Sequence, residues 1–337
     1  MIGDIFDIED DFIVIKKHIL VSYDDIKIIR VFSNIIAYLK NGYKCFYTEK
    51  GEPINNQYIK NLKFVSNLLK SNNINPKQLI ILYENNTDSH INYLNELGFE
   101  HTLCIKWITG ATTQNFIENN YLSNDLDKKF LFLNRVKKGH RVELYEYFKD
   151  SNIINNAYYS AKWLNESNFK EDYQSEKVKL RVDVHDHLID VYNQSYIHIV
   201  TETKYEDVIE NIDVSFFSEK TFRHLAFNRP FILVAQKNSI KTLKSYGFKT
   251  FGEFIDESYD GLDYSERMGK IKEIIFDLNK KSNKELFEMC KECETIFQHN
   301  RLHLFEFAKS IQNNISKKYP QFFKRMDELI SNYKILC

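Results

Sequence analysis

The feature that most constrains the fold is an uninterrupted apolar run, Leu79 to Tyr83 (LIILY), which follows Pro76. A run of this length predicts a strand that is buried on both faces, as in a parallel sheet. The segments before it alternate between helical and extended patterns. DDIKIIRVFSNIIAYLKNG has apolar residues at helical spacing and ends at Gly42, whereas YKCFYT favours a strand. Such alternation predicts βαβ units around a parallel sheet.

The same alternation continues along the chain. In the first hundred residues we expect one or two short strands in DDFIVIKKHILVSY, helices in IKNLKFVSNLLKSNNI and HINYLNELGF, and a strand in HTLCIKWIT. Further on we expect strands in KFLFLNRV and SYIHIVTET and helices in HRVELYEYFKDSN and SIKTLKSYGF. The stretch from Asn155 to about Arg181 is polar and predicted to be irregular, and the chain after Tyr264 is predicted to be nearly all helix.

The length of 337 residues favours two domains, since one hydrophobic core seldom serves so long a chain. The loose segment GATTQNFIENNYLSNDLDKK separates the two runs of alternation. We therefore predict two Rossmann-like α/β domains, at residues 1–120 and 128–300, followed by helices at 301–337. The cleft between the domains is the expected principal pocket, next to Arg135 and Glu219.

Composition excludes several classes of protein. Lys and Arg number 46 and Asp and Glu 47, so no overall basic excess favours a nucleic-acid or anionic membrane surface. Five scattered cysteines argue against a disulfide framework, and no run of eighteen apolar residues or signal peptide is present. These features predict a cytoplasmic protein without an integral membrane segment. The abundance of Asn, Ile, Lys and Tyr is typical of an AT-rich genome, viral or bacterial.

Charged and polar residues gather where the strands of the second half end. They are Arg135, Lys137, Lys138, His140 and Arg141 after FLFLN, Glu202 after SYIHIVT, and Ser218, Glu219, Lys220 and Arg223 in SFFSEKTFRHLAFNRPFILVA. Ligands of open α/β sheets bind at the carboxyl ends of the strands. Basic side chains and a helix start suit a diphosphate, and a carboxylate suits the hydroxyls of a ribose. Glu219 is equally well explained as an ordinary favourable charge at a helix start.

The segments IVTET, FFSEKTFRHLAFNRPFILVA and SIKTLKSYGFKTF resemble the donor-binding domain of GT-B glycosyltransferases of the fucosyltransferase-like group. The resemblance covers roughly residues 128 to 262. It implies that Glu219 binds the ribose, that Lys220 and Arg135 bind the diphosphate, and that Glu202 orders the loop or touches the donor. It also implies a C-terminal helix that packs back on the first domain.

The sequence departs from that family in two places. GFKTFGEFIDESYD carries an acidic cluster at Asp256, Glu257 and Asp260, and the first domain has no recognisable acceptor signature. The resemblance therefore supports the fold and the donor class, but not fucose.

Two other patterns suggest metal binding only weakly. His185-Asp186-His187 lacks a third ligand at suitable spacing, and Cys290 and Cys293 lie in a helical stretch without a second pair. We expect no essential metal, because basic side chains and a helix start neutralise the diphosphate in GT-B enzymes. The basic run that begins at Arg135 lacks the interleaved aromatic residues of a nucleic-acid site.

The predicted activity is glycosyl transfer from a nucleotide-diphosphate sugar to the hydroxyl of a glycan, protein, lipid or modified DNA. If the reaction inverts, a carboxylate of the first domain must act as base, with Glu84 as first candidate and Glu49 and Asp88 after it. The alternative is a non-catalytic nucleotide- or glycan-binding module of the same fold. A dinucleotide-dependent oxidoreductase or a P-loop enzyme is disfavoured because the glycine-rich fingerprints are absent.

Overall fold

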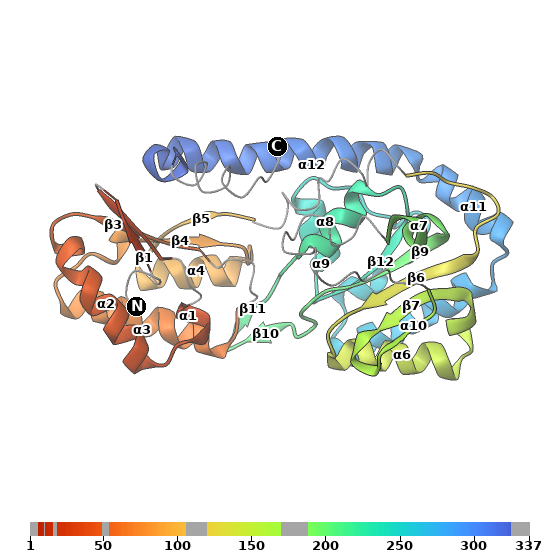
Figure 1. The fold of residues 1–337 in the computed structure, drawn as a ribbon, viewed down its shortest axis with the longest axis horizontal. Helices are drawn as coiled ribbons and strands as arrows, with labels where there is room; N and C mark the ends of the chain where they lie inside the picture. The colour runs from red at the N-terminus through yellow and green to blue at the C-terminus, as the bar shows by residue number, and fades with distance from the viewer. Residues whose placement is uncertain are drawn as a thin grey trace. The chain divides into compact units, whose positions relative to one another are not determined.

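The computed structural model describes residues 6–9, 11–15, 19–48, 54–105, 120–169 and 188–324. These residues form two compact units, each built on its own five-stranded, mainly parallel sheet (Figure 1). The predicted mixed α/β class is thereby confirmed. The first unit holds the described residues within 1–106, 207–216 and 309–324, and the second unit holds those within 120–206 and 217–308.

The sheet of the first unit has the strand order β1-β2-β3-β4-β5. Its strands are β1 (Phe6–Ile8), β2 (Phe12–Ile15), β3 (Lys44–Thr48), β4 (Leu79–Tyr83) and β5 (Glu100–Leu103). Strands β2 to β5 are parallel, and β1 pairs with β2 in the antiparallel direction. All five residues of β4 are buried, which confirms the prediction from the LIILY run.

The helices of this unit are α1 (Ile19–Ser22), α2 (Asp25–Lys40), α3 (Asn56–Ser71) and α4 (Asp88–Leu97). Side-chain caps explain where the longer ones begin, since Asp24, Asn55 and Thr87 each accept a hydrogen bond from a backbone N–H of the first turn. Helix α4 ends at Gly98, whose φ of 85° is a left-handed conformation that glycine adopts without strain.

One short segment differs from its predicted structure. ILVS was included in a region expected to form strands, but it forms the helical turn α1. Ile19 and Leu20 are fully buried in the core, and the amide of Asn61 on α3 donates hydrogen bonds to the carbonyls of Leu20 and Tyr23. These contacts to α3 hold the turn, and a segment of four residues is too short for its pattern to distinguish it from a strand.

The first unit also contains a hairpin from much later in the chain. The predicted boundaries assigned this hairpin to the second domain. Its strands are β10 (Val208–Ile209) and β11 (Ile212–Asp213). The side chain of Asn85, just after β4, donates to the carbonyl of Asp213 at 3.1 Å and accepts from the amide of Ser215 at 2.5 Å. The hairpin is thus fastened to the carboxyl edge of the first sheet.

The end of the described chain packs on the same sheet. Tyr319 and Phe322 follow α12 (Glu294–Lys318), and their rings lie 5.2 and 4.1 Å from the ring of Phe46 on β3. The hydroxyl of Tyr319 donates to Glu100 on β5 at 2.6 Å. Residues 325–337, part of the predicted C-terminal helical segment, lie outside the described residues.

The sheet of the second unit has the order β12-β9-β6-β7-β8. Its strands are β6 (Lys128–Asn134), β7 (Ala157–Ala161), β8 (Glu166–Ser167), β9 (Ser195–Thr201) and β12 (Phe231–Val234), and only the short β8 is antiparallel to its neighbour. Its helices are α6 (Gly139–Asp150), α7 (Ile189–Asn193), α8 (Glu219–Ala226), α9 (Ser239–Ser245), α10 (Tyr264–Lys280) and α11 (Asn283–Glu292). Helices α6 and α10 lie side by side next to β7 (Figure 1).

The prediction of an irregular segment from Asn155 onward was wrong for its first part. AYYSA forms β7, which pairs with β6 over its whole length. Ala157, Ser160 and Ala161 are buried, so small side chains fill the inner positions where a typical strand would have Val or Ile. The composition of this strand, rather than its packing, made it look irregular.

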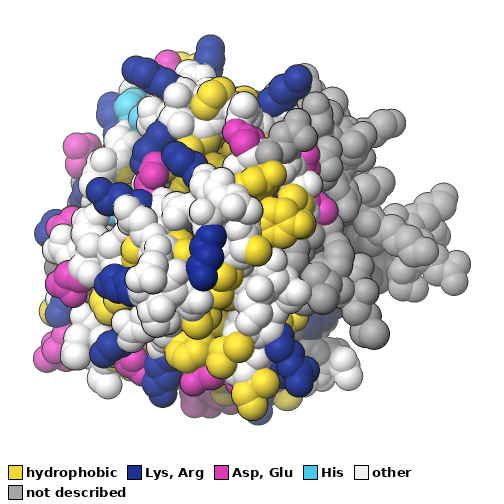
Figure 2. Space-filling view, turned by 90° about the vertical axis from the view of Figure 1, so that its left-hand side faces the viewer, with side chains coloured by type: hydrophobic (Ala, Val, Ile, Leu, Met, Phe, Trp, Pro, Cys, Tyr) yellow, Lys and Arg dark blue, Asp and Glu magenta, His cyan; other side chains and the backbone are white. Residues whose placement is uncertain are grey.

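No helix among the described residues is both long and apolar enough to cross a membrane. On the face shown in Figure 2, basic and acidic side chains are interspersed, and neither charge gathers into a continuous patch. This mixture agrees with the nearly balanced formal charge of -1.

Candidate functional site

The second sheet contains a reversal of strand order that defines a candidate ligand site. From the central β6 the chain moves through α6 to β7 on one side, whereas β9 and β12 lie on the other side of β6. Open α/β sheets bind ligands at the carboxyl ends of the strands where the order reverses. Here that point lies between the ends of β6 and β9, at Asn134 and Thr201. The described parallel strands of the first unit follow chain order without such a reversal.

Glu202, which directly follows β9, is fully buried and ties β9 to the start of α8. One carboxylate oxygen accepts from the amide of Ser218 at 2.9 Å and the hydroxyl of Thr221 at 2.6 Å. The other accepts from the hydroxyl of Ser218 at 2.7 Å and the amide of Thr203 at 3.1 Å. With four donors around it, Glu202 orders the loop, which is one of the two roles that the resemblance implies.

Helix α8 begins with the three polar residues that the sequence singled out. Ser218 is the N-cap, and its hydroxyl accepts from the amide of Lys220 at 3.3 Å. The ammonium of Lys220 donates to the same hydroxyl at 2.9 Å and lies 3.5 Å from the carboxylate of Glu219. Both charged side chains are partly exposed, at 31% for Lys220 and 25% for Glu219. They are therefore placed where a ligand can reach them.

His140 and Arg141 at the start of α6 are turned into the protein. The imidazole Nε2 of His140 lies 3.0 Å from the carbonyl of Glu202, and its ring stacks on Tyr205 with centroids 5.2 Å apart. Arg141 donates to the carbonyls of Thr201 and Glu202 at 3.0 and 2.9 Å. Burial, with the nearby Arg141 charge, lowers the pKa of His140 to about 4, so the ring is neutral at pH 7.

The remaining predicted cations differ in exposure. Arg135 and Lys137 lie on the exposed loop between β6 and α6, and no hydrogen bond or ion pair joins either of them to another described residue. Arg223 lies one helical turn after Glu219 and is buried, with 5% of its surface exposed. Arg135 and Lys137 are thus exposed cations of this edge that remain available to an anionic ligand, in addition to Lys220.

A small pocket of about 40 Å³ opens beside Lys220. Its walls are Leu131, Leu133, Ile199 and Val200 on β6 and β9, and its polar residues are Tyr192, Thr201, Lys220 and His224. The sequence reasoning missed His224 and Tyr192. The spacing of four residues between Lys220 and His224 places them on one face of α8, and this signal could have identified His224.

The same edge carries buried amide groups that lack partners. The amide nitrogen of Asn134 and both amide atoms of Gln236 have no hydrogen-bond partner among the described residues, although the two side chains are only 2% and 1% exposed. Asn134 ends β6, and Gln236 lies two residues beyond β12. Buried polar groups in native proteins are nearly always hydrogen-bonded, so this pair marks an edge suited to hydrogen-bonding a ligand.

The candidate bases belong to the first unit. Glu84 directly follows β4 at the carboxyl edge of that sheet and is 6% exposed. Asp88 is the exposed first residue of α4. Glu49 lies outside the described residues, as do His185, Asp186 and His187.

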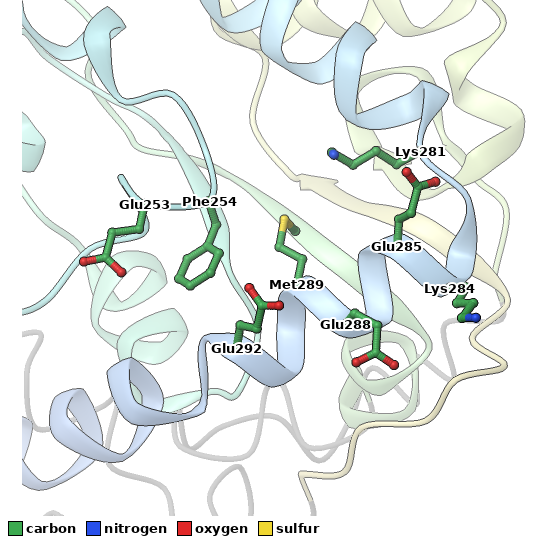
Figure 3. Close-up of a pocket in the computed structure, with 8 residues that line it drawn as sticks. All are labelled: Glu253, Phe254, Lys281, Lys284, Glu285, Glu288, Met289 and Glu292. Atoms are coloured by element: carbon green, nitrogen blue, oxygen red, sulfur yellow. The ribbon is translucent and has the colours of Figure 1, made fainter.

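The larger pocket, of 590 Å³, lies elsewhere in the second unit (Figure 3). Helix α11 supplies most of its lining, and the ring of Phe254 and the side chain of Met289 lie opposite each other in it. It contains neither Arg135 nor Glu219. Four glutamates and two lysines line it, so its charge does not suit an anionic nucleotide.

The acidic cluster that departs from the family pattern is structural. Glu257 accepts from the hydroxyl of Thr250 and the amide of Phe251, both at 2.8 Å, and pairs with Lys244 at 2.9 Å. Asp260 accepts from the amides of Ile240 and Lys241, in the first turn of α9, at 2.8 and 3.0 Å and so serves as its cap. These carboxylates hold the loop between α9 and α10 and are occupied by the protein itself.

Cys290 and Cys293 are buried, and burial raises the pKa of the Cys290 thiol to about 12. Within the described ranges, no group of three or more His, Cys, Asp or Glu is arranged to hold a metal ion. The two thiols therefore act as ordinary core side chains.

No known family model matches the chain, and no curated protein is significantly similar to it.

Proposed function

We propose that the protein is a glycosyltransferase that moves a sugar from a nucleotide-diphosphate donor to an acceptor hydroxyl, with a GT-B-like pair of domains. The observation that carries the proposal is the edge where β6 and β9 diverge. There, the exposed cations of the β6–α6 loop and the partly exposed Glu219 and Lys220 stand at the reversal of strand order. A nucleoside diphosphate needs this combination of cations, helix start and carboxylate.

In this proposal, Glu219 accepts the hydroxyls of the ribose, while Lys220 and Arg135 neutralise the diphosphate as it leaves. Lys220 is held by the hydroxyl of Ser218 and the carboxylate of Glu219. A bound diphosphate would replace the interaction with Glu219 and leave that carboxylate to the ribose. Charge on the leaving group grows in the transition state, so Lys220 and Arg135 contribute chiefly to turnover.

The acceptor is assigned to the first unit, and Glu84 is the proposed base of an inverting reaction. It directly follows β4, at the carboxyl end of that strand. A carboxylate with only 6% of its residue surface exposed is held in place to accept a proton from a hydroxyl. Replacing Glu84 with Gln is expected to abolish transfer while nucleotide binding is retained.

A thermal-shift series with UDP, GDP and their hexose conjugates tests the proposal. A ligand present at a hundred times its dissociation constant adds about 2.7 kcal/mol to the free energy of unfolding, which gives a clear rise in melting temperature. Slow hydrolysis of the bound nucleotide sugar would then demonstrate catalysis. Absence of any shift contradicts the donor site. Binding without hydrolysis or transfer favours the alternative, a non-catalytic nucleotide- or glycan-binding module.

A further inference from the structure

The 40 Å³ pocket beside Lys220 has one polar group whose hydrogen-bonding role is fixed by its surroundings. The Nδ1 atom of His224 lies 2.7 Å from the carbonyl oxygen of Lys220. A carbonyl can only accept, so Nδ1 carries the hydrogen, and in the neutral ring Nε2 has a free lone pair. The ring is fixed by stacking on Tyr192, with centroids 5.3 Å apart.

Several neighbours keep this imidazole neutral. The ring of His198 lies edge-on to it at 5.0 Å, and both Lys220 and Arg223 place positive charge nearby. Burial is the largest cause of the low pKa of His224, which is about 3. His224 therefore accepts hydrogen bonds at neutral pH and does not attract anions. Its chemistry differs from that of Lys220, which borders the same pocket.

We propose that this pocket is a subsite for a hydroxyl group of the donor nucleotide, and that Nε2 of His224 accepts the hydrogen bond of that hydroxyl. The inference rests on the proposed function, because the ligand is the same nucleotide sugar. The pocket volume of about 40 Å³ leaves room for a hydroxyl group beside the ring. Lys220 binds phosphate oxygen, and His224 accepts from a hydroxyl.

Two substitutions distinguish the contribution of the hydrogen-bond acceptor at Nε2 from that of the packing of the ring. In His224→Asn the amide N–H can still donate to the carbonyl of Lys220, but the shorter side chain places nothing at Nε2. In His224→Gln the longer side chain brings an amide oxygen to the Nε2 position. Both variants lose the stacking on Tyr192 equally. We expect His224→Asn to raise the dissociation constant about tenfold, the value of one hydrogen bond, and His224→Gln to remain within about threefold of the parent.

Calorimetric titration with UDP, GDP and their hexose conjugates supplies the measurement. If His224→Asn binds UDP or GDP without a sugar about tenfold more weakly, the hydroxyl belongs to the ribose. If it binds only the hexose conjugates more weakly, the hydroxyl belongs to the transferred sugar. Equal losses in both variants, or none in either, overturn the subsite and leave the proposed function standing. A parent protein that binds no nucleotide overturns both.

A measurement on the parent protein covers the case in which a variant does not fold. The nitrogen-15 resonance of Nε2 in His224 is expected to move upfield when a hydroxyl donates to it, while that of Nδ1 stays in place. An unchanged Nε2 resonance at saturating nucleotide contradicts the proposal.

Discussion

Two glutamates beside the start of α8 show how position decides what a carboxylate does. Glu219 is partly exposed and pairs with Lys220, whereas Glu202 is fully buried and accepts four hydrogen bonds. A carboxylate at an exposed helix start stabilises the fold by less than about 1 kcal/mol. In the proposed function Glu219 binds the ligand, whereas the buried carboxylate of Glu202 is needed by the fold itself.

Glu219→Ala is expected to weaken binding of a nucleoside diphosphate by roughly 1.5–3 kcal/mol, the value of a charge-assisted hydrogen bond. The free energy of unfolding should fall by less than about 1 kcal/mol. Titration with nucleotide beside a urea-unfolding curve measures both quantities. If the variant binds nucleotide as tightly as the parent, Glu219 does not bind the ribose and the assigned donor site is wrong.

Glu202→Ala should show the opposite balance. Removal of the carboxylate leaves the hydroxyl of Thr221 and the amides of Ser218 and Thr203 without their acceptor in a buried site. We expect the free energy of unfolding to fall by about 3 kcal/mol or more, since each orphaned buried donor costs about 1–3 kcal/mol. Glu219→Ala is the matched control. A loss no larger than that of the control contradicts a structural role for Glu202.

Lys220 and Arg135 are expected to act on rate. Lys220→Ala and Arg135→Ala should each lower kcat by more than they raise the dissociation constant of the donor, because the leaving diphosphate gains charge as the bond breaks. Steady-state kinetics combined with equilibrium titration separates the two effects. An unchanged kcat in both variants is incompatible with their proposed role on the leaving group.

At the scale of single elements, the end of α9 is set by one glycine. Gly247 has a φ of 93°, and a Cβ built on it lies 2.6 Å from Nε2 of His303. That nitrogen is itself 2.7 Å from the carbonyl of Tyr246, so the ring cannot move away without losing its hydrogen bond. Gly42 has a similar φ of 88°, but no heavy atom lies within 4 Å of its Cβ position.

These two glycines separate backbone strain from steric overlap. Gly42→Ala should lower the free energy of unfolding by about 1 kcal/mol, because alanine is strained in the left-handed conformation. Gly247→Ala should cost roughly 1–3 kcal/mol more, because the added methyl group overpacks against His303. Urea unfolding of both variants provides the comparison. Equal losses would show that α9 and α12 yield to the methyl group.

The elements that the sequence predicted well are those with a long, regular pattern. The LIILY strand and the helices ending near Gly42 and Gly98 follow from apolar runs, periodicity and caps. AYYSA was missed because its inward residues are small, and α1 because a turn of four residues has no measurable period. The β10–β11 hairpin could not be assigned to the first unit from sequence, since its partner Asn85 lies more than a hundred residues away.

At the scale of the whole molecule, the order of the strands explains how much of the candidate site was predictable. Arg135, Glu202 and Lys220 were found because each directly follows a strand or begins a helix. Their different roles were not predictable, because burial and hydrogen-bond partners depend on tertiary packing. His224 belongs to the same edge but was treated as the body of a helix, since its importance depends on Tyr192, which packs against it from α7.

The second unit as a whole is expected to be sensitive to acid because it buries three neutral histidines. Burial is the largest cause in each case: it lowers the pKa of His140 to about 4 and of His224 to about 3, and that of His198 well below 6.5. Positive charges at Arg141 and Arg229 act in the same direction. In the unfolded chain each histidine takes up a proton near pH 6.5, so the unfolded state binds more protons below that value.

Stability contributed by these neutral rings is therefore full above about pH 6.5 and falls as the pH drops toward the folded-state values. At pH 5.5 each histidine should lower the free energy of unfolding by on the order of 1 kcal/mol. Urea unfolding from pH 8 to pH 5 measures how the free energy of unfolding changes with pH. His140→Phe keeps an aromatic ring on Tyr205 and should remove about a third of the change that the three histidines cause. A variant with the slope of the parent would mean that His140 is already protonated in the folded protein. In that case its Nδ1 would carry a second proton, and the hydrogen bond to the carbonyl of Glu202 would join a charged ring to β9.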